Sequence, residues 1–217
     1  MKTTDSFFLR KSHIAVVLDD HSLFADSFSA TLERLRIFNA VHAFNREKDL
    51  IRFLIQHDLG NIFLFVDYYL KENNASFVIG EVKRIKKNIN IIIISSVINP
   101  VTIKSILTYR PKGFVSKSSG TDIIIDCIKK ISKGEAYLCP VIHEILDSSD
   151  SIEDMPFTAR ELDILSYFAK GLSIAETAEQ TFLSKHTIVS HRRKMMAKTH
   201  SKSITELLAY CRRMNLI

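Results

Sequence analysis

Apolar runs alternate with amphipathic stretches over the first part of the chain, between residues 13 and about 133. Short apolar runs bounded by polar residues are typical of strands buried on both faces of a sheet. The strand candidates are "HIAVVLDD", "NAVHAFN", "NIFLFVD", "INIIIISS" and "KGFVSK". Stretches with apolar residues at helical spacing follow them, namely "LFADSFSATLERLR", "EKDLIRFLIQH", "SFVIGEVKRIKK", "VTIKSILTYR" and "TDIIIDCIKKIS". This alternation predicts a doubly wound α/β domain with a five-stranded parallel sheet, which binds ligands at the carboxyl ends of its strands.

After residue 139 the pattern changes to helices alone. The segment "HEILDSSDSIEDMPF" is polar and follows a short apolar piece, which predicts a linker. Four helical patterns come next: "TARELDILSYFAKG", "SIAETAEQTF", "SKHTIVSHRRKMMAKT" and "SITELLAYCRRM". Thr158, Ser184 and Ser203 are the expected N-caps, because a hydroxyl group accepts from the free amides of a first helical turn. We predict an α/β domain over residues 10–138, a linker over 139–155 and a four-helix, all-α domain over 156–217.

The composition is that of an ordinary globular protein, with 217 residues of which 46% are hydrophobic and 25% charged. No apolar stretch approaches the roughly 18 residues that a membrane span needs, and the first residues do not resemble a signal peptide. The three cysteines, Cys127, Cys139 and Cys211, are widely separated and odd in number. This favours reduced thiols over a disulfide framework or a zinc site. We therefore expect a cytoplasmic protein.

Polar side chains stand where the predicted strands end: Asp19, Asp20, Asp67, Ser95 and Lys117. The paired aspartates raise a question, because neighbouring carboxylates repel one another unless they lie in water or hold a cation. Since the carboxyl ends of parallel strands share one edge of a sheet, we expect these side chains to form one pocket. Carboxylate oxygens are suitable ligands for Mg²⁺. The sequence therefore predicts a magnesium site at this edge.

The same side chains are suited to phosphoryl transfer onto a carboxylate. In this interpretation Asp67 is the nucleophile, and Mg²⁺ neutralises charge on the incoming phosphoryl group. Lys117 forms an ion pair with the phosphoryl oxygens, and Ser95 hydrogen-bonds the new phosphoryl group.

The motifs "VVLDDH", "IFLFVD", "IIIISS" and "GFVSK", in this order and spacing, resemble the receiver domain of bacterial two-component response regulators. The resemblance covers about residues 13–133. It implies that Asp67 accepts a phosphoryl group from a histidine kinase. It also implies that Asp20 binds Mg²⁺ directly, that Asp19 acts mostly through water, and that the backbone carbonyl of Tyr69 completes the metal site.

Further positions of the receiver motif are matched or altered. Phe114 falls where the family carries an aromatic or similar residue that swings inward together with the hydroxyl group at Ser95. The loop after the phosphoacceptor reads "YYLKENNA", with Lys71 in place of the usual proline, and "TYRPKGF" replaces a run that is normally small and glycine-rich. Because the pocket residues are retained, we expect the domain to be competent for phosphorylation.

Positive charge is concentrated near the C-terminal end. The net charge is +6, and the stretch from Lys185 to Arg213 has eight basic residues against one acid, Glu206. Such a segment suits the phosphate backbone of a nucleic acid. On a helical wheel centred on Ile188 as the buried position, the opposite face carries His186, Ser190, Arg193 and Ala197, bordered by Val189 and Lys194. This face suits the major groove of DNA, although an isolated basic helix is more often a solvated surface.

The segment from Phe157 to Leu207 closely resembles the LuxR-type helix-turn-helix domain. Matching positions include Thr158, Arg160, Glu161, Leu165, Gly171, Leu172, Ser173, Ala178, Leu183, Ser184, Thr187, Ile188, His191, Lys198, Ser203, Glu206 and Leu207. The resemblance implies a recognition helix over about 185–198. It places at base-reading positions Val189, Ser190 and Arg193. It places near the sugar-phosphate backbone Lys185, Thr187, His191 and Lys198. Lys194 borders the same face on the helical wheel. The sequence departs from the family pattern at two places: Thr177 replaces a usual aliphatic residue, and "KTHSKS" replaces a leucine-glycine turn. The segment "KGEAYLCP" resembles the end of the receiver domain in the NarL/FixJ class.

Together the two halves predict a DNA-binding response regulator and not an enzyme. Phosphorylation of Asp67, with Mg²⁺ as cofactor, would shift the receiver between two states through Ser95 and Phe114 and so control transcription. The implied partners are double-stranded DNA, a histidine kinase and a second copy of the chain, with RNA polymerase as a further candidate and no membrane. One alternative is a phosphorylation-independent factor whose receiver serves for protein docking or dimerisation. A freestanding hydrolase is weaker, because no second nucleophile-base pair is present.

Overall fold

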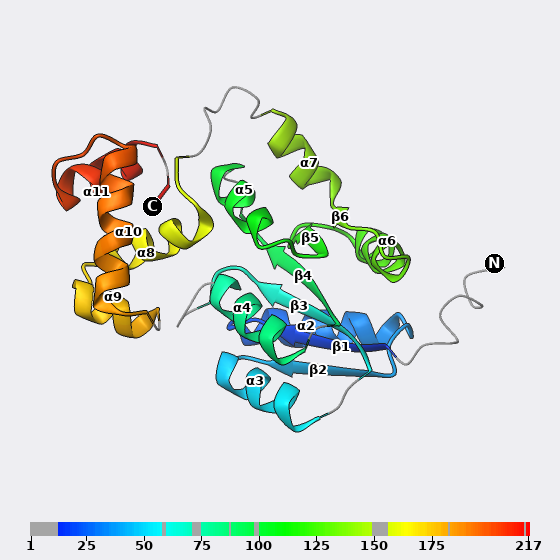
Figure 1. The fold of residues 1–217 in the computed structure, drawn as a ribbon. Coiled ribbons are helices and arrows are strands. Elements are labelled where there is room, and N and C mark those ends of the chain that lie inside the picture. The colour runs from blue at the N-terminus through cyan, green and yellow to red at the C-terminus, as the bar shows by residue number, and fades with distance from the viewer. Residues whose placement is uncertain are drawn as a thin grey trace. The chain divides into compact units, whose positions relative to one another are not determined.

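The computed structural model describes residues 13–57, 60–70, 75–86, 88–97, 100–148, 156–181, 183–214 and 216–217. Within these residues a sheet of six parallel strands has the order β2-β1-β3-β4-β5-β6 (Figure 1). The strands are β1 (His13–Leu18), β2 (Ala40–Phe44), β3 (Asn61–Asp67), β4 (Ile89–Ser95), β5 (Gly113–Ser116) and β6 (Tyr137–Leu138). The predicted doubly wound parallel sheet is confirmed. The predicted count of five strands was wrong. The sixth strand, β6, was missed because it has only two residues and no apolar run marks it in the sequence.

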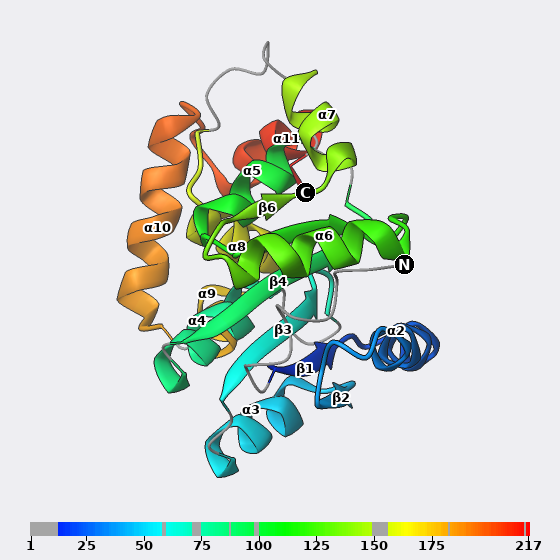
Figure 2. The same ribbon diagram turned by 90° about the vertical axis from the view of Figure 1, so that its right-hand side faces the viewer.

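The helices that alternate with the strands along the chain follow the predicted amphipathic stretches. They are α2 (Ser22–Arg34), α3 (Glu47–Gln56), α4 (Ala75–Ile85), α5 (Pro100–Thr108) and α6 (Thr121–Ser132). Helices α3 and α4 lie on one side of the sheet, and α2 and α6 lie on the other (Figure 2). Because both faces are covered, the central strands β1, β3 and β4 are almost entirely buried, which explains their continuous apolar sequences.

A ladder of polar side chains connects three strands near their amino ends. His13 pairs with Asn61 in the parallel register of β1 and β3. The Nδ2 atom of Asn61 lies 3.1 Å from Nδ1 of His13, and Nδ2 of Asn90 in β4 donates to Oδ1 of Asn61 at 2.8 Å. The His13 ring is buried and stands edge-on to Phe63, with ring centroids 5.3 Å apart. The ladder lies at the end of the sheet opposite to the carboxyl ends of these strands.

The chain divides into two compact units. The first lies within Met1–Ser96 and Pro111–Ile142, and the second within Val97–Arg110 and His143–Ile217. Helix α5 therefore groups with the later helices. Helix α7 (Pro140–Asp147) occupies part of the segment predicted as a linker, and residues 149–155 lie outside the described part of the chain. The domain limits inferred from the sequence stay a prediction.

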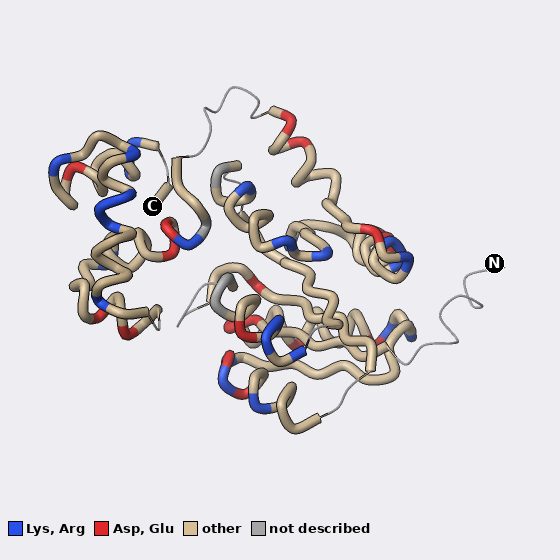
Figure 3. Tube along the Cα trace, viewed as in Figure 1, with Lys and Arg blue, Asp and Glu red and all other residues tan. Residues whose placement is uncertain are grey.

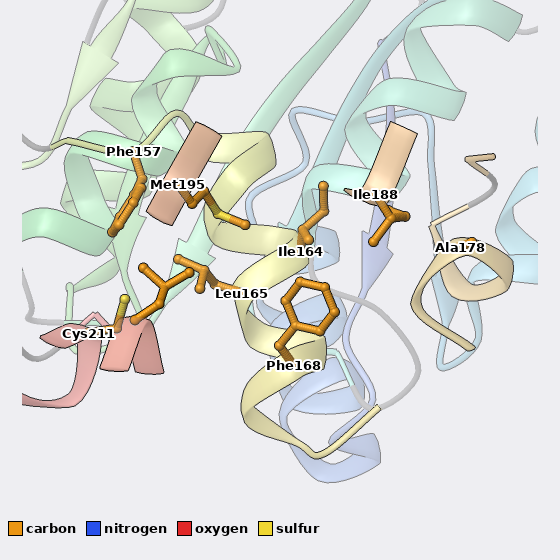
Figure 4. Close-up of a cluster of buried hydrophobic side chains, with 9 residues drawn as sticks. Phe157, Ile164, Leu165, Phe168, Ala178, Ile188, Met195 and Cys211 are labelled. Atoms are coloured by element: carbon orange, nitrogen blue, oxygen red, sulfur yellow. The ribbon is translucent and has the colours of Figure 1, made fainter. Parts of the chain in front are cut away.

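Four further helices follow in the second unit: α8 (Ala159–Ala169), α9 (Ile174–Gln180), α10 (Lys185–Lys198) and α11 (Ile204–Arg213). Their number confirms the four-helix prediction. Their shared core consists of Phe157, Ile164, Leu165, Phe168, Ala178, Ile188, Met195, Leu207 and Cys211 (Figure 4). Each helix begins with a hydroxyl side chain that accepts from a backbone N–H three residues on, at Thr158, Ser173, Ser184 and Ser203. The N-caps expected at three of these positions are therefore confirmed.

Other sequence expectations can be compared with the described residues. All three cysteines are buried and free. Among the described residues, no helix combines the length and apolar character that crossing a bilayer requires. Residues 1–12, which include the segment compared with signal peptides, lie outside the description.

Candidate functional site

The parallel register of the sheet determines which side chains meet at the carboxyl edge. Leu18 pairs with Val66 across β1 and β3, so Asp19 and Asp67 emerge at the same level. Ser95 is the last residue of β4 and pairs with Ser116 of β5, and Lys117 follows directly. The backbone N–H of Lys117 donates to the carbonyl of Ser95 at 2.9 Å, which fixes the start of the lysine side chain. The convergence expected from the sequence is thus present for Asp19, Asp67 and Lys117.

The ammonium group of Lys117 bridges two buried carboxylates. Its Nζ atom lies 2.6 Å from Oδ2 of Asp19 and 2.9 Å from Oδ2 of Asp67. The carboxylate side chains are only 2% and 4% exposed, and the lysine side chain is 15% exposed. Nζ also lies 4.3 Å from the ring centroid of Phe24, within the range of a cation–π interaction. One positive charge therefore compensates two negative charges in a site largely closed to water.

Burial and charge pairing oppose each other at this pair. Burial raises the pKa of Asp67, and the Asp19 carboxylate adds to the rise, although hydrogen bonds from Lys117 and the backbone N–H of Tyr69 act in the other direction. The net pKa of Asp67 is above its ordinary value. Burial would lower the pKa of Lys117, but its hydrogen bonds to Asp19 and Asp67 outweigh this effect and raise the pKa. Lys117 is thus held in its charged form.

Two further side chains, those of Asp20 and His21, lie near the same carboxylates and directly precede α2. Asp20, predicted as the direct metal ligand, has a side chain that is 9% exposed, and its Oδ1 lies 3.1 Å from Nδ1 of His21. The same Nδ1 lies 3.2 Å from Oδ1 of Asp19 and 4.0 Å from Oδ2 of Asp67. Each of these four residues offers one ligand atom, and the four atoms lie within 4.8 Å of one another. This donor set fits a divalent ion.

The sequence reasoning gave no role to His21. The signal was present, because the imidazole directly follows the two aspartates in "VVLDDH". It was missed because a histidine beside carboxylates is commonly a solvated loop residue, and only the fold brings Asp67 near to it.

The predicted switch residues are in place but buried. Ser95 and Phe114 are both fully buried, and Phe114 pairs with Ile93 of β4 and Leu138 of β6. Tyr69, whose carbonyl was predicted as a metal ligand, follows the acceptor by two residues and is 54% exposed. Lys71, at the altered loop position, lies outside the described residues. The roles given to these residues stay predictions.

Helix α10 presents the residues that were predicted to contact DNA. Ile188 and Met195 are fully buried, as expected from the helical wheel. Lys and Arg residues recur along α10 (Figure 3). Of the predicted contact residues, Lys185, Arg193, Lys194 and Lys198 are exposed, and Thr187, Val189, Ser190 and His191 are partly buried.

Two of these side chains already have partners within the unit. Nζ of Lys198 lies 2.6 Å from Oε2 of Glu161, whose side chain is 4% exposed. Oγ1 of Thr187 lies 2.8 Å from Oγ of Ser184, the N-cap of α10, which also accepts from the backbone N–H of Thr187 at 3.1 Å. Burial would raise the pKa of Glu161, but hydrogen bonds from Lys198 and from Thr158 outweigh it and hold the pKa below its ordinary value. Lys198 therefore has a structural partner that the sequence did not indicate.

Comparison with known proteins covers both parts of the chain. Residues 155–211 match the family described as "Bacterial regulatory proteins, luxR family". The "Fimbriae Z protein" of Salmonella typhimurium is 24% identical over 206 residues, covering 93% of this chain and 97% of that protein. The "Oxygen regulatory protein NreC" of Staphylococcus carnosus is 29% identical over 124 residues, covering 52% of this chain and 57% of that protein.

Solved structures agree in fold. The response regulator RcsB from Salmonella enterica serovar Typhimurium, bound to the promoter rprA in the presence of phosphomimetic BeF₃⁻, superimposes with a TM-score of 0.70 and 22% identity. That match covers 91% of this chain and 96% of the other. With the parallel sheet, the Lys117 bridge and the four capped helices, these findings lead to one conclusion. Residues 155–211 therefore form a LuxR-type helix-turn-helix domain, and the chain as a whole is similar in sequence and fold to response regulators of the NarL/FixJ class, in which a receiver domain precedes such a domain.

Proposed function

We propose that this protein regulates transcription by binding DNA, under the control of phosphorylation at Asp67. A histidine kinase supplies the phosphoryl group, and Mg²⁺ is the cofactor. The observation that carries the proposal is the bridge from the Lys117 ammonium to Asp19 and Asp67, beside a third aspartate, Asp20, at the same strand edge. A homodimer reads paired half-sites in DNA. The similarity to the "Oxygen regulatory protein NreC" supports the same function.

Each side chain of the pocket has its own role in phosphoryl transfer. A carboxylate oxygen of Asp67 attacks phosphorus, a new O–P bond forms, and the P–N bond to the donor histidine breaks as the imidazole leaves with a proton. Lys117 compensates the negative charge that builds up on the phosphoryl oxygens. Asp19, Asp20 and Asp67 would hold the divalent ion, which would neutralise charge on the phosphoryl group. Ser95 donates a hydrogen bond to the phosphorylated acceptor.

Phosphorylation is tested by intact mass after incubation with acetyl phosphate and Mg²⁺. The wild-type chain is expected to gain the mass of one phosphoryl group, and Asp67→Ala is expected to gain none. Asp126→Ala is a matched control, because that carboxylate is 61% exposed on α6. An added phosphoryl group that survives Asp67→Ala contradicts the assignment, and its absence from the wild type favours the phosphorylation-independent docking function.

DNA reading is tested at Arg193, which is exposed on α10 and lies at a predicted base-reading position. We expect Arg193→Ala to reduce discrimination between a sequence selected from a random DNA pool and a scrambled one by about tenfold or more, because a bidentate arginine–guanine contact is lost. Gel-shift titrations of both sequences measure this ratio. Arg52→Ala, which removes an arginine that is 68% exposed on α3, should leave the ratio unchanged. Equal ratios for all three proteins would show that α10 does not read bases.

A further inference from the structure

We infer that His21 is a ligand of the divalent ion, which makes the acidic pocket a mixed nitrogen and oxygen site with a raised affinity for transition-metal ions relative to Mg²⁺. The inference rests on the proposed function, because it deepens the metal site of the receiver. It assigns to His21 a role that the three carboxylates do not supply.

The distances around Nδ1 of His21 match those between ligands of one ion. Two neighbouring ligands on an octahedral ion with bonds of ~2.1 Å lie about 3.0 Å apart, and two opposite ligands lie about 4.2 Å apart. Nδ1 lies 3.2 Å from Asp19 Oδ1 and 3.1 Å from Asp20 Oδ1, which are neighbouring-ligand separations. Its separation of 4.0 Å from Asp67 Oδ2 is close to that of opposite ligands. The position of the imidazole relative to the three carboxylates is therefore compatible with binding to a shared ion, since the four ligand atoms also lie within 4.8 Å of one another.

The backbone holds His21 in this place. Its N–H donates to Oδ1 of Asp19 at 2.8 Å, immediately before α2 begins. Asp19 thus divides its two oxygens, with Oδ2 facing Lys117 and Oδ1 facing His21. At Asp19 the imidazole and the ammonium group use different oxygens, whereas at Asp67 both face Oδ2, with Lys117 at 2.9 Å and His21 at 4.0 Å.

The His21 side chain is the most solvent-exposed of the four candidate ligands. It is 65% exposed, whereas the side chains of Asp19, Asp20 and Asp67 are 2%, 9% and 4% exposed. An ion that enters from solvent therefore meets the imidazole as well as the buried carboxylates. The exposure also means that replacing His21 removes few packing contacts, so variants at this position should fold.

The ligand types predict a preference among ions. Carboxylates and water suit Mg²⁺, whereas imidazole suits first-row transition ions. Affinity also rises from Mn²⁺ towards Ni²⁺ for sites of this kind. The nitrogen donor should therefore increase the affinity for Ni²⁺ relative to Mg²⁺ beyond what the carboxylates alone provide.

Pulsed electron paramagnetic resonance of the full chain with bound Mn²⁺ tests the ligand directly, without phosphorylation. The wild type is expected to show coupling of the electron spin to a directly bound ¹⁴N nucleus, and His21→Ala is expected to lose it. His143→Ala, which removes an exposed histidine of α7 outside the cluster, should keep it. Bound Mn²⁺ without nitrogen coupling in the wild type would overturn the inference, since the imidazole would then be a hydrogen-bonding counter-charge only.

Competition titrations with Mg²⁺ and Ni²⁺ give a second measurement. We expect His21→Ala to lower the ratio of Ni²⁺ to Mg²⁺ affinity by about tenfold, with His143→Ala unchanged. An unchanged ratio in His21→Ala overturns the role of His21 but leaves the magnesium site of the proposed function intact. If no divalent ion binds to the wild type, both the inference and the metal part of the proposed function fail.

Discussion

Lys117→Met is expected to slow phosphorylation from acetyl phosphate by about a hundredfold, because the positive charge facing the phosphoryl oxygens is lost. The same change is expected to destabilise the receiver by about 3 kcal/mol, since it leaves two buried carboxylates together without their counter-charge. Methionine retains much of the apolar stem of lysine and so isolates the charge. Time courses of intact mass measure the rate, and urea unfolding of the full chain measures the stability.

Two comparisons make this result specific. Lys112→Met removes an exposed lysine just before β5 and should change neither quantity. Asp67→Asn in the Lys117→Met background should recover much of the lost stability, because it removes one of the two repelling charges. If Lys117→Met unfolds at the wild-type urea concentration, the ammonium group does not compensate Asp19 and Asp67 as the 2.6 and 2.9 Å distances indicate.

Lys198→Met is expected to destabilise the helix-turn-helix unit by about 2 kcal/mol, because Glu161 would remain buried and ionised without its partner. Glu161 is only 3% exposed and also accepts from the backbone N–H of Thr158 at 2.7 Å in the capping box of α8. The loss should therefore reach the start of α8. Urea unfolding, together with hydrogen exchange of amides in α8 and α10, measures the effect.

The pH dependence has a definite sign. Because the pKa of Glu161 is held below its ordinary value of 4.5, the pair stabilises the folded state fully above that pH, and the contribution is lost as the pH falls towards the lowered folded value. In Lys198→Met the carboxyl group can be protonated more easily, so wild type and variant should converge in stability on acidification. Lys194→Met, an exposed lysine of the same helix, should follow the wild type. A stability difference that stays constant from neutral to acidic pH would exclude this ion pair as the cause.

DNA binding by the same variant, Lys198→Met, tests a second role of Lys198. The sequence predicted contact with the sugar-phosphate backbone, and the structure places its ammonium group on Glu161. If the phosphate contact is also made, the salt dependence of DNA binding should flatten in Lys198→Met at temperatures where the unit remains folded.

The parts that could be predicted from sequence are those with a repeated physical signal. The strands β1, β3 and β4 are continuous apolar runs because both faces of the sheet are covered, and the polar residues at their carboxyl ends share one edge because the strands are parallel. The cap at Thr158 was predictable because its partner Glu161 is only three residues away. Local patterns of this kind can be read without the fold.

The missed features lack such a pattern. Strand β6 consists of Tyr137 and Leu138 alone. It is a strand only through its backbone pairing with Gly113 and Phe114 of β5, which no pattern in the sequence indicates. Lys198 and Glu161 are separated by 37 positions, and no periodicity connects them. His21 shares a motif with Asp20, but its approach to Asp67 depends on how β1 and β3 are aligned.

That alignment is controlled from the far end of the sheet. Sliding β1 past β3 by one position would separate the imidazole of His13 from the amide of Asn61, and a similar slip of β4 would leave Asn90 without its carbonyl partner. A displaced strand would therefore bury polar groups without hydrogen-bond partners. The free energy that this costs in the wrong register is larger than the free energy that the hydrogen bonds contribute in the correct one. The side chains of His13, Asn61 and Asn90 thus favour the alignment that brings residues 19 and 67 to the same level, although they lie at the opposite end of the sheet from the chemistry.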